Sequence, residues 1–334
     1  MQPDTHKITI GDNVAKIEEL LAELVLAPRI NLIRWSALTK QTPNIRIGYP
    51  GQHLASLVTG VAGERTGARG NDLSDGSEVK SCSRIDQLDQ CLNCKYPVAR
   101  LENVCPNCGS DKIKRNNDSK WLFSIRSAAE LELITQKIDR VLLVIGDYPN
   151  FIDGDYETLR FQAFELWPKH PRNLRFAEIL TNYYNKIYLA HKQARPNSNP
   201  APKNFWPYQY QFYLCNPILT FSCTVTDANS KPKIVIEKYL DPSQDRANEP
   251  SVMMPVGILK EAELESVLRA ASEEELKPLL IDPAMSKELL LTLPYQQKKE
   301  AIKGVDEYLR KYLPLRDTDR ISTAKTDYAR RAVI

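Results

Sequence analysis

Residues 71–80, NDLSDGSEVK, decide how this chain is interpreted. The segment from Ser77 to Cys82 has the pattern of a strand, and residues two apart on a strand face the same side. Glu78 and Lys80 therefore point in one direction, while Val79 packs into the core. Together with the helices and strands expected around it, this acidic turn and strand predict an α/β fold whose sheet carries a polar site.

Carboxylates at this spacing are typical of a Mg²⁺ site, because this cation prefers oxygen ligands and keeps several of its waters. We expect the side chains of Asp72 and Glu78 to bind the ion, with the carbonyl of Val79 as a further ligand. Lys80 would orient or polarise the attacking water and offset developing negative charge, as phosphodiester hydrolysis requires. Asp75 is the alternative to Asp72, although an Asp-Gly pair also suits a turn. The simplest alternative is an acidic turn before an exposed edge strand.

Hydrophobic patterns on both sides of this motif predict a mixed sheet flanked by helices. Asn13 is a plausible first cap and Pro28 a plausible stop for the first helix, and Ser127 starts a later helix with a capping box. Helices are expected at residues 13–27, 30–38, 51–61 and 127–137, and strands at 77–82, 120–126, 140–146 and 159–166. The continuous apolar run at 140–146 is typical of a buried central strand.

The chain changes character after residue 168, where polar helices and Pro-rich loops alternate. Helices are expected at 177–193, 259–271, 273–280, 286–293 and 295–313, and loops at 195–202 and 241–251. The aromatic run 205–213 alternates like a core strand, and stacking on nucleic-acid bases is its other possible role.

Four cysteines form two C-x-x-C pairs, Cys91/Cys94 and Cys105/Cys108. This spacing predicts a zinc site, and four thiolates leave no open position, so the Zn²⁺ should be structural. A redox dithiol is the alternative. The surrounding loop has little apolar material, so the metal would substitute for a core.

Overall charge is only +3 over 334 residues, but basic residues cluster locally. Lys112, Lys114 and Arg115 in the cysteine region could contact DNA phosphates, or the region could serve as a scaffold or dimer contact. A second basic cluster lies at 310–331.

The chain has 42% apolar residues, no apolar run long enough to cross a membrane and a polar start, so we expect a cytoplasmic protein.

The acidic motif resembles the PD-(D/E)xK nuclease superfamily, and residues 47–167 look like type II restriction endonucleases of the MamI type. The likeness rests on YPGQHLASLVTG at 49–60, TGARG at 66–70, DGSEVKSC at 75–82, the cysteine pairs and DSKWLFSI at 118–125. Some superfamily members add a Glu or Gln from the preceding helix, which makes Gln52 and Glu64 auxiliary candidates.

The resemblance implies a restriction-endonuclease-like core at 47–167 with a zinc ribbon inserted at 86–118. Residues 1–46 would be an N-terminal helical region, and residues 168–334 would serve DNA recognition and dimerisation. It further implies Mg²⁺-dependent, sequence-specific cleavage of double-stranded DNA by a homodimer, because both strands of a symmetric site must be cut. The alternatives are a repair, junction-resolving or modification-dependent nuclease of the same fold, or a non-enzymatic zinc-ribbon DNA-binding protein.

Two further residues near the motif invite a catalytic role. His53 lies on the helix before the motif, and Cys82 follows Lys80 on the same strand face. A lone histidine is more often a packed helix residue, and a cysteine nucleophile needs a base partner that the sequence does not indicate. We therefore expect neither to be catalytic.

Overall fold

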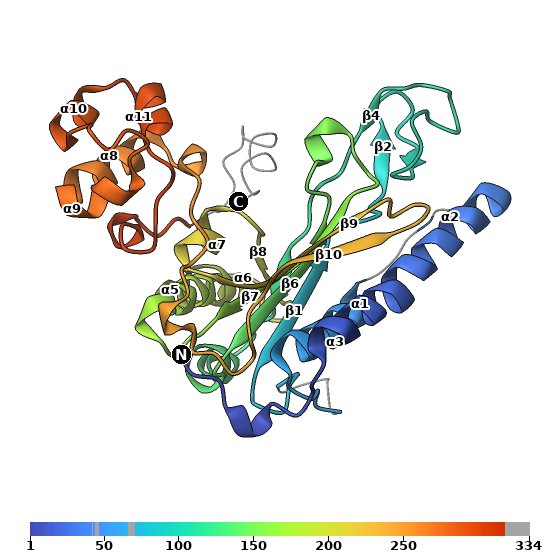
Figure 1. Cartoon of the computed structure of the whole chain (residues 1–334), viewed down its shortest axis with the longest axis horizontal. Helices are drawn as coiled ribbons and strands as arrows, with labels where there is room; N and C mark the ends of the chain where they lie inside the picture. The colour runs from blue at the N-terminus through green and yellow to red at the C-terminus, as the bar shows by residue number, and fades with distance from the viewer. Residues whose placement is uncertain (42, 44–46, 66–70, 318–334) are drawn as a thin grey trace. The chain divides into compact units, whose positions relative to one another are not determined.

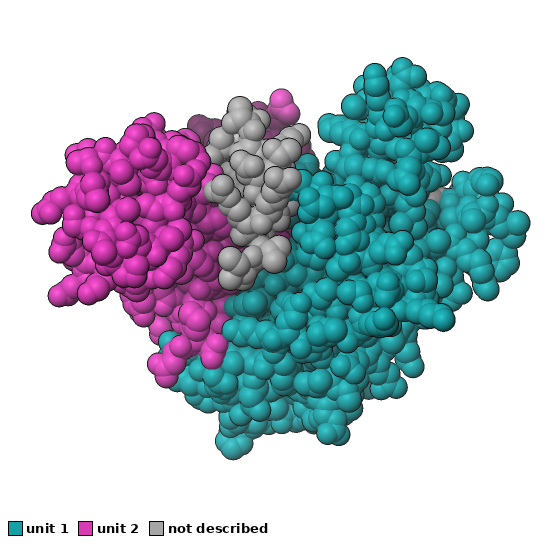
Figure 2. Space-filling view, turned by 45° about the horizontal axis from the view of Figure 1, so that its top comes forward, with its two compact units in different colours: residues 1–121, 140–165, 219–247 teal, residues 122–139, 166–218, 248–334 magenta. Residues whose placement is uncertain are grey.

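The computed structural model describes residues 1–41, 43, 47–65 and 71–317 and divides the chain into two compact units (Figures 1 and 2). Unit 1 consists of Met1–Trp121, Arg140–Glu165 and Leu219–Ala247, and unit 2 consists of Leu122–Asp139, Leu166–Ile218 and Asn248–Ile334. The TGARG segment at 66–70 and the end of the basic cluster at 310–331 lie outside the described residues.

A five-stranded mixed sheet forms the centre of unit 1, in the order β1-β6-β7-β9-β10 (Figure 1). Its strands are β1 (Glu78–Ser83), β6 (Val141–Asp147), β7 (Leu159–Leu166), β9 (Ile218–Thr226) and β10 (Lys233–Tyr239). β1 runs parallel to β6, whereas β9 and β10 are antiparallel. Every residue of β6 and β7 is buried, as inner strands require. The predicted mixed sheet is confirmed, as are three of the predicted strands in it.

Helices α1 and α3 cover this sheet, and their apolar faces join its core. α3 (Gly48–Thr59) matches the helix predicted at 51–61 and ends at Gly60, whose backbone is left-handed with φ +68°. Glycine adopts this conformation without steric cost, so it terminates the helix just before the acidic motif.

The first helix continues past Pro28, so the predicted stop there is wrong. α1 (Asn13–Leu21), a π-helical turn (Ala22–Leu26) and α2 (Ala27–Thr39) follow one another without a break. In the π turn the N–H of Ala27 bonds to the carbonyl of Ala22, five residues back. This wider turn accommodates the proline, which has no N–H and would clash with a regular preceding turn. Asn13 is not the cap either, because Asp12 occupies that position.

Strand β5 differs from its prediction. β5 (Trp121–Phe123) lies within the strand expected at 120–126, but it pairs with β8 (Lys203–Phe205) in a separate two-stranded sheet. The last two strands of the central sheet, β9 and β10, instead come from beyond residue 167.

Between β5 and β6, α4 (Ala128–Glu132) and a π turn (Leu133–Lys137) form the predicted helix, with Ser127 accepting the N–H of Glu130 at 3.1 Å.

The cysteine region is a small three-stranded sheet between β1 and β5, in the order β3-β2-β4. Its strands are β2 (Asp89–Cys91), β3 (Pro97–Val98) and β4 (Ile113–Lys114). Three buried residues, Cys91, Val98 and Cys105, form its core. Two of the four paired cysteines therefore make up most of this small interior.

Unit 2 is mainly helical in its described part. The helix predicted at 177–193 is present as α5 (Leu174–Tyr183), a π turn (Tyr184–Tyr188) and α6 (Leu189–Ala194). The other helices are α7 (Tyr210–Leu214), α8 (Glu261–Ala270), α9 (Glu273–Leu276), α10 (Lys287–Thr292) and α11 (Tyr295–Ala301). The predicted helix at 295–313 is thus only partly formed. Within the described ranges, no helix combines the length and apolarity needed to cross a bilayer.

The aromatic run 205–213 belongs to the core, but its prediction as a strand is wrong. Only Phe205 lies in a strand, and the run ends inside helix α7. Tyr208 turns the chain with a positive φ of 57°, and Pro207 cannot donate to a strand ladder. The alternation arises instead from a buried turn that leads into a short helix.

Candidate active site and metal centre

The carboxylate-lysine motif lies on an edge strand of the central sheet. The N–H of Glu78 donates to the carbonyl of Arg140 at 3.0 Å, so the backbone groups of Val79 face away from β6, toward the open edge. Glu78 and Lys80 share one face of β1 and form an ion pair. Their side chains are only 14% and 26% exposed, respectively. The structure therefore brings these two residues together as their spacing predicts.

Asp72 reaches the same strand edge from the preceding turn. One of its carboxylate oxygens accepts the N–H of Val79 at 2.8 Å, and the other accepts the side-chain amide of Gln52 at 3.2 Å. These two hydrogen bonds fix the carboxylate beside β1. Gln52 thus contacts the site through Asp72.

The carboxyl of Glu78 has an altered proton affinity. Burial raises the pKa of Glu78 above its ordinary value. Lys80 lowers this pKa, whereas the negative charge of Asp72 adds to the rise. The carboxylates of Asp72 and Glu78, beside a backbone carbonyl at an open strand edge, are a ligand set suited to a hard divalent cation such as Mg²⁺.

Asp75 has a different environment. Its carboxylate accepts the N–H of Ser77 at 3.0 Å and pairs with Arg140 at 2.5 Å. Arg140 also donates to Ser77 and pairs with Glu165, and all three of these charged side chains are at most 8% exposed. Asp75 therefore holds the turn that leads into β1.

The close packing of α3 on β1 positions Gln52. A Cβ added at Gly51 would lie 2.5 Å from the hydroxyl oxygen of Ser81 and 2.7 Å from its Cβ. Only glycine allows this approach without a shift of Ser81. The adjacent Gln52 is thereby held within reach of Asp72.

The remaining candidates around the motif contact the site less directly. The side chain of Glu64 is exposed, although its N–H donates to the carbonyl of Asp72 at 2.9 Å. His53 is exposed on α3. Cys82 is buried, and burial raises the pKa of its thiol to about 12, so it would not ionise readily.

The four cysteines of the ribbon converge on one point. The sulfur of Cys91 lies 3.7 Å from that of Cys108, and the sulfur of Cys94 lies 3.5 Å from that of Cys105. All four sulfurs lie within 4.8 Å of one another. Tetrahedral zinc with Zn–S bonds of about 2.3 Å separates sulfurs by about 3.8 Å. The cluster can therefore hold a metal ion of this kind.

Two asparagines that the sequence analysis did not single out complete this cluster. The side-chain amide of Asn93 donates to the sulfur of Cys108, and that of Asn107 donates to the sulfur of Cys94, both at 3.6 Å. The hydrogen bond from Asn107 is the main cause that lowers the pKa of Cys94, to about 6. The repeated C-x-N-C spacing is the signal that could have identified them. Hydrogen bonds of this type favour the thiolates that bind a metal.

The three basic residues predicted to contact DNA differ in exposure. Lys112 and Lys114 are exposed on the ribbon. The guanidinium of Arg115 instead pairs with Asp89 at 2.9 Å and donates to the carbonyl of Glu102 at 2.7 Å. Arg115 therefore has an internal structural role in the ribbon, whereas both lysines are accessible to a ligand.

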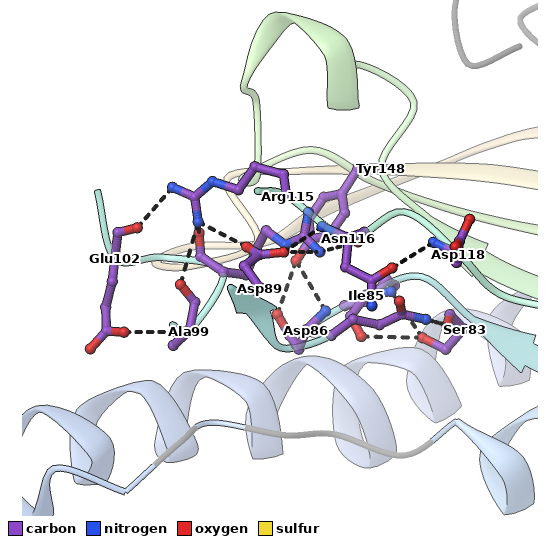
Figure 3. Close-up of polar contacts among 12 residues, drawn as sticks. Ser83, Ile85, Asp86, Asp89, Ala99, Glu102, Arg115, Asn116, Asp118 and Tyr148 are labelled. Atoms are coloured by element: carbon purple, nitrogen blue, oxygen red, sulfur yellow. Dashed lines mark hydrogen bonds and ion pairs between the residues drawn. The ribbon is translucent and has the colours of Figure 1, made fainter. Parts of the chain in front are cut away.

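Hydrogen bonds and ion pairs order the base of the ribbon and join it to the rest of unit 1 (Figure 3). Asp89 accepts from Arg115 and from the N–H of Asn116 at 2.6 Å, and it pairs with Arg100 at 3.1 Å. The guanidinium of Arg100 lies 4.8 Å from the ring centre of Phe151. Nearby, the hydroxyl of Tyr148 donates to Asp86 at 2.9 Å, and Arg29 pairs with the same carboxylate. These contacts hold the ribbon beside the end of β1.

A mixed sheet with two carboxylates and a lysine gathered beside its edge strand, followed by a four-cysteine ribbon, is an arrangement suited to a metal-dependent nuclease. The sequence model of the MamI restriction endonuclease family matches residues 34–257, more than half of the chain. The chain therefore belongs to the MamI restriction endonuclease family, which confirms the resemblance noted in the sequence.

One relative provides a direct sequence comparison. The chain is similar to the type II restriction enzyme MamI of Microbacterium ammoniaphilum, with 39% identity over 83 residues. The matched segment covers 25% of this chain and 27% of that enzyme, so the chain spans little more than a quarter of this relative's length in the match. No solved structure matches the chain.

Proposed function

We propose that this protein is a type II restriction endonuclease that hydrolyses phosphodiester bonds at specific sites in double-stranded DNA with Mg²⁺. The observation that carries the proposal is the cluster of Asp72, Glu78 and Lys80 at the edge of the sheet, in a chain of the MamI family. A restriction-endonuclease-like core is the fold that this function implies.

In this proposal each residue of the cluster has a separate task. The carboxylates of Asp72 and Glu78 and the carbonyl of Val79 would hold Mg²⁺, which supplies charge stabilisation and lowers the pKa of a bound water. The N–H of Val79 and the amide of Gln52 keep the Asp72 carboxylate in place. The ammonium of Lys80 would orient the attacking water and stabilise negative charge on the phosphate.

The ion pair between Glu78 and Lys80 links these tasks. Each side chain holds the other on one face of β1. Glu78 would share its charge with a bound cation, which would leave the ammonium of Lys80 available to the phosphate. The lysine is thus already in position before DNA binds.

The ribbon is proposed to contain one structural Zn²⁺ bound by Cys91, Cys94, Cys105 and Cys108. Support comes from the convergence of the four sulfurs and from the small core around them. Without the ion, the ribbon has too little apolar material to remain folded.

Lys112 and Lys114 would contact DNA phosphates, and these contacts add affinity without specificity. Arg115, also predicted to bind DNA, would act mainly within the ribbon.

Residues 168–334 are proposed to serve DNA recognition and dimerisation, and a homodimer would cut both strands of a symmetric site. Their described part contains most of the helical unit and the last two strands of the sheet. Base contacts in the major groove would have to come from side chains outside the shared catalytic core.

Digestion of a large unmodified DNA of known sequence tests the proposal. The purified protein should produce discrete fragments with Mg²⁺ and none with a chelator, and Glu78→Ala should abolish the fragments. Cleavage restricted to methylated or branched DNA would instead favour a modification-dependent or junction-resolving nuclease. An absence of cleavage of every DNA tested would contradict the proposal.

A further inference from the structure

The helix formed by α1, the π turn and α2 has an apolar strip that is exposed in the described part of the chain. On one side, Val25, Leu26 and Arg29 are buried against the body of unit 1. On the other side, Leu24, Trp35 and Leu38 are 43%, 53% and 72% exposed. In Figure 1 the end of α2 extends beyond the neighbouring strands of the sheet. Large apolar side chains gathered on one exposed helix face mark an interaction surface.

The order of residues along this strip is symmetric about its middle. The strip consists of Leu24, Ala27, Asn31, Trp35 and Leu38, all of them exposed. The intervals between them are three, four, four and three residues, so the sequence of spacings reads the same in both directions. Spacings of three and four residues keep side chains on one helix face. A strip with such symmetry can pair with an antiparallel copy of itself around Asn31.

Side-chain size and charge are also complementary in that pairing. It places Leu24 against the partner subunit's Leu38, and the bulky Trp35 against the partner subunit's small Ala27. Asn31 meets the partner subunit's Asn31 on the twofold axis, where a polar residue in an apolar seam fixes the register. At each end the acidic Glu23 comes near the partner subunit's basic Lys40, and both residues are exposed.

We propose that this strip is a homodimer contact, in which the helix containing α2 pairs with the same helix of a second copy of the chain. A twofold contact uses the same surface on both subunits, and the strip has the self-complementarity that such a contact needs. The guanidinium of Arg34 lies 5.6 Å from the ring centre of Trp35 and steadies this ring for the contact. The proposal rests on the proposed function in one respect, because a nuclease that cuts both strands of a symmetric site needs two subunits.

A cysteine placed on the twofold axis tests the geometry. Asn31→Cys in the full chain should form a covalent dimer under mild oxidation, because the two copies of this residue meet. Ala37→Cys is the matched control, since Ala37 is exposed on the same helix but lies off the strip. This control and the unmodified chain should remain largely uncrosslinked. Equal crosslinking at both positions, or none at residue 31, would overturn the proposal.

Sedimentation without DNA or Mg²⁺ tests the contact energetically. Leu38→Asp should raise the dimer dissociation constant at least about thirtyfold, because it places a charge against the partner subunit's Leu24 at both ends of the contact. Leu289→Asp should leave it unchanged, because Leu289 is 52% exposed on α10, far from the strip in sequence. A chain that is monomeric at every concentration, or a dimer insensitive to Leu38→Asp, would refute the contact.

A charge reversal distinguishes the predicted register from nonspecific association. Glu23→Lys and Lys40→Glu should each weaken the dimer by roughly tenfold, since like charges then face each other at both ends. The double variant should recover the original dissociation constant. Two weakened single variants without recovery in the double variant would refute the antiparallel register. Dimerisation with normal constants but no DNA cleavage would leave this contact intact and refute the proposed function instead.

Discussion

Asparagine substitution at each of the two candidate aspartates separates the metal ligand from the structural residue. Asp75 and Arg140 are 8% and 2% exposed, and their side chains lie 2.5 Å apart. Asp75→Asn removes the charge of this pair but can still accept the N–H of Ser77. Breaking a buried ion pair costs about 3–5 kcal/mol. Arg140 retains its ion pair with Glu165 at 3.3 Å. We therefore expect Asp75→Asn to lower the free energy of unfolding by about 3 kcal/mol, near the lower limit of this range.

Asp72→Asn should have the opposite effects. The asparagine carbonyl can still accept the N–H of Val79, so the free energy of unfolding should change by less than about 1 kcal/mol. The site loses one anionic ligand, so Mg²⁺-dependent cleavage should fall by at least about 10²-fold, the usual effect of removing one charge-stabilising group.

Urea unfolding and cleavage rates, measured at a temperature where both variants are folded, check these expectations. Asp75→Asn should unfold at lower urea concentration and still cleave DNA, whereas Asp72→Asn should remain stable and inactive. A stable, inactive Asp75→Asn together with an active Asp72→Asn would show that the two roles are assigned the wrong way round.

Three further outcomes follow from the same structure. Glu78→Gln should stabilise the metal-free protein at neutral pH by about 0.5–2 kcal/mol. Folding raises the pKa of Glu78, so the wild type loses stability as this carboxyl ionises and is fully stable only below its ordinary pKa of 4.5. The stabilisation by Glu78→Gln should therefore vanish below pH 4.5. A constant stabilisation at all pH values would contradict this reasoning. Gly51→Ala should lower the free energy of unfolding by about 1–3 kcal/mol through its clash with Ser81. Adding Ser81→Gly should restore most of that stability in thermal unfolding. No recovery in the double variant would show that the clash is not the cause. Lys114→Ala should lower the magnitude of the slope of log DNA affinity against log salt concentration by about one, with unchanged stability. Arg115→Ala should mainly destabilise the ribbon. Equal effects of the two substitutions would argue against these separate roles.

Local patterns predicted the central elements well. The apolar run at 140–146 and the alternation from Glu78 to Lys80 reflect burial of strand faces, and both became neighbouring strands. The C-x-x-C pairs predicted the cluster of sulfurs because a metal site constrains spacing strongly. These features depend on short segments, so a single sequence contains them.

Features that depend on distant partners could not be predicted in this way. The pairing of Arg140 with Asp75 joins residues 65 positions apart, and this pairing is what distinguishes Asp75 from Asp72. The completion of the sheet by β9 and β10 likewise depends on long-range contacts. Pro28 does not end the helix, because the wider π turn before it accommodates the proline ring. The surrounding structure, and not the local sequence, determines this turn.

The most direct test of the catalytic site is a parallel measurement of DNA affinity and cleavage rate for Lys80→Ala, with Glu274→Ala as an exposed control. Lys80 is expected to act on the attacking water and the phosphate, so cleavage with Mg²⁺ should fall by at least about 10²-fold while affinity changes only a few-fold. Glu274→Ala should match the wild type in both. Cleavage by Lys80→Ala at the wild-type rate would contradict the assignment of the active site to this strand.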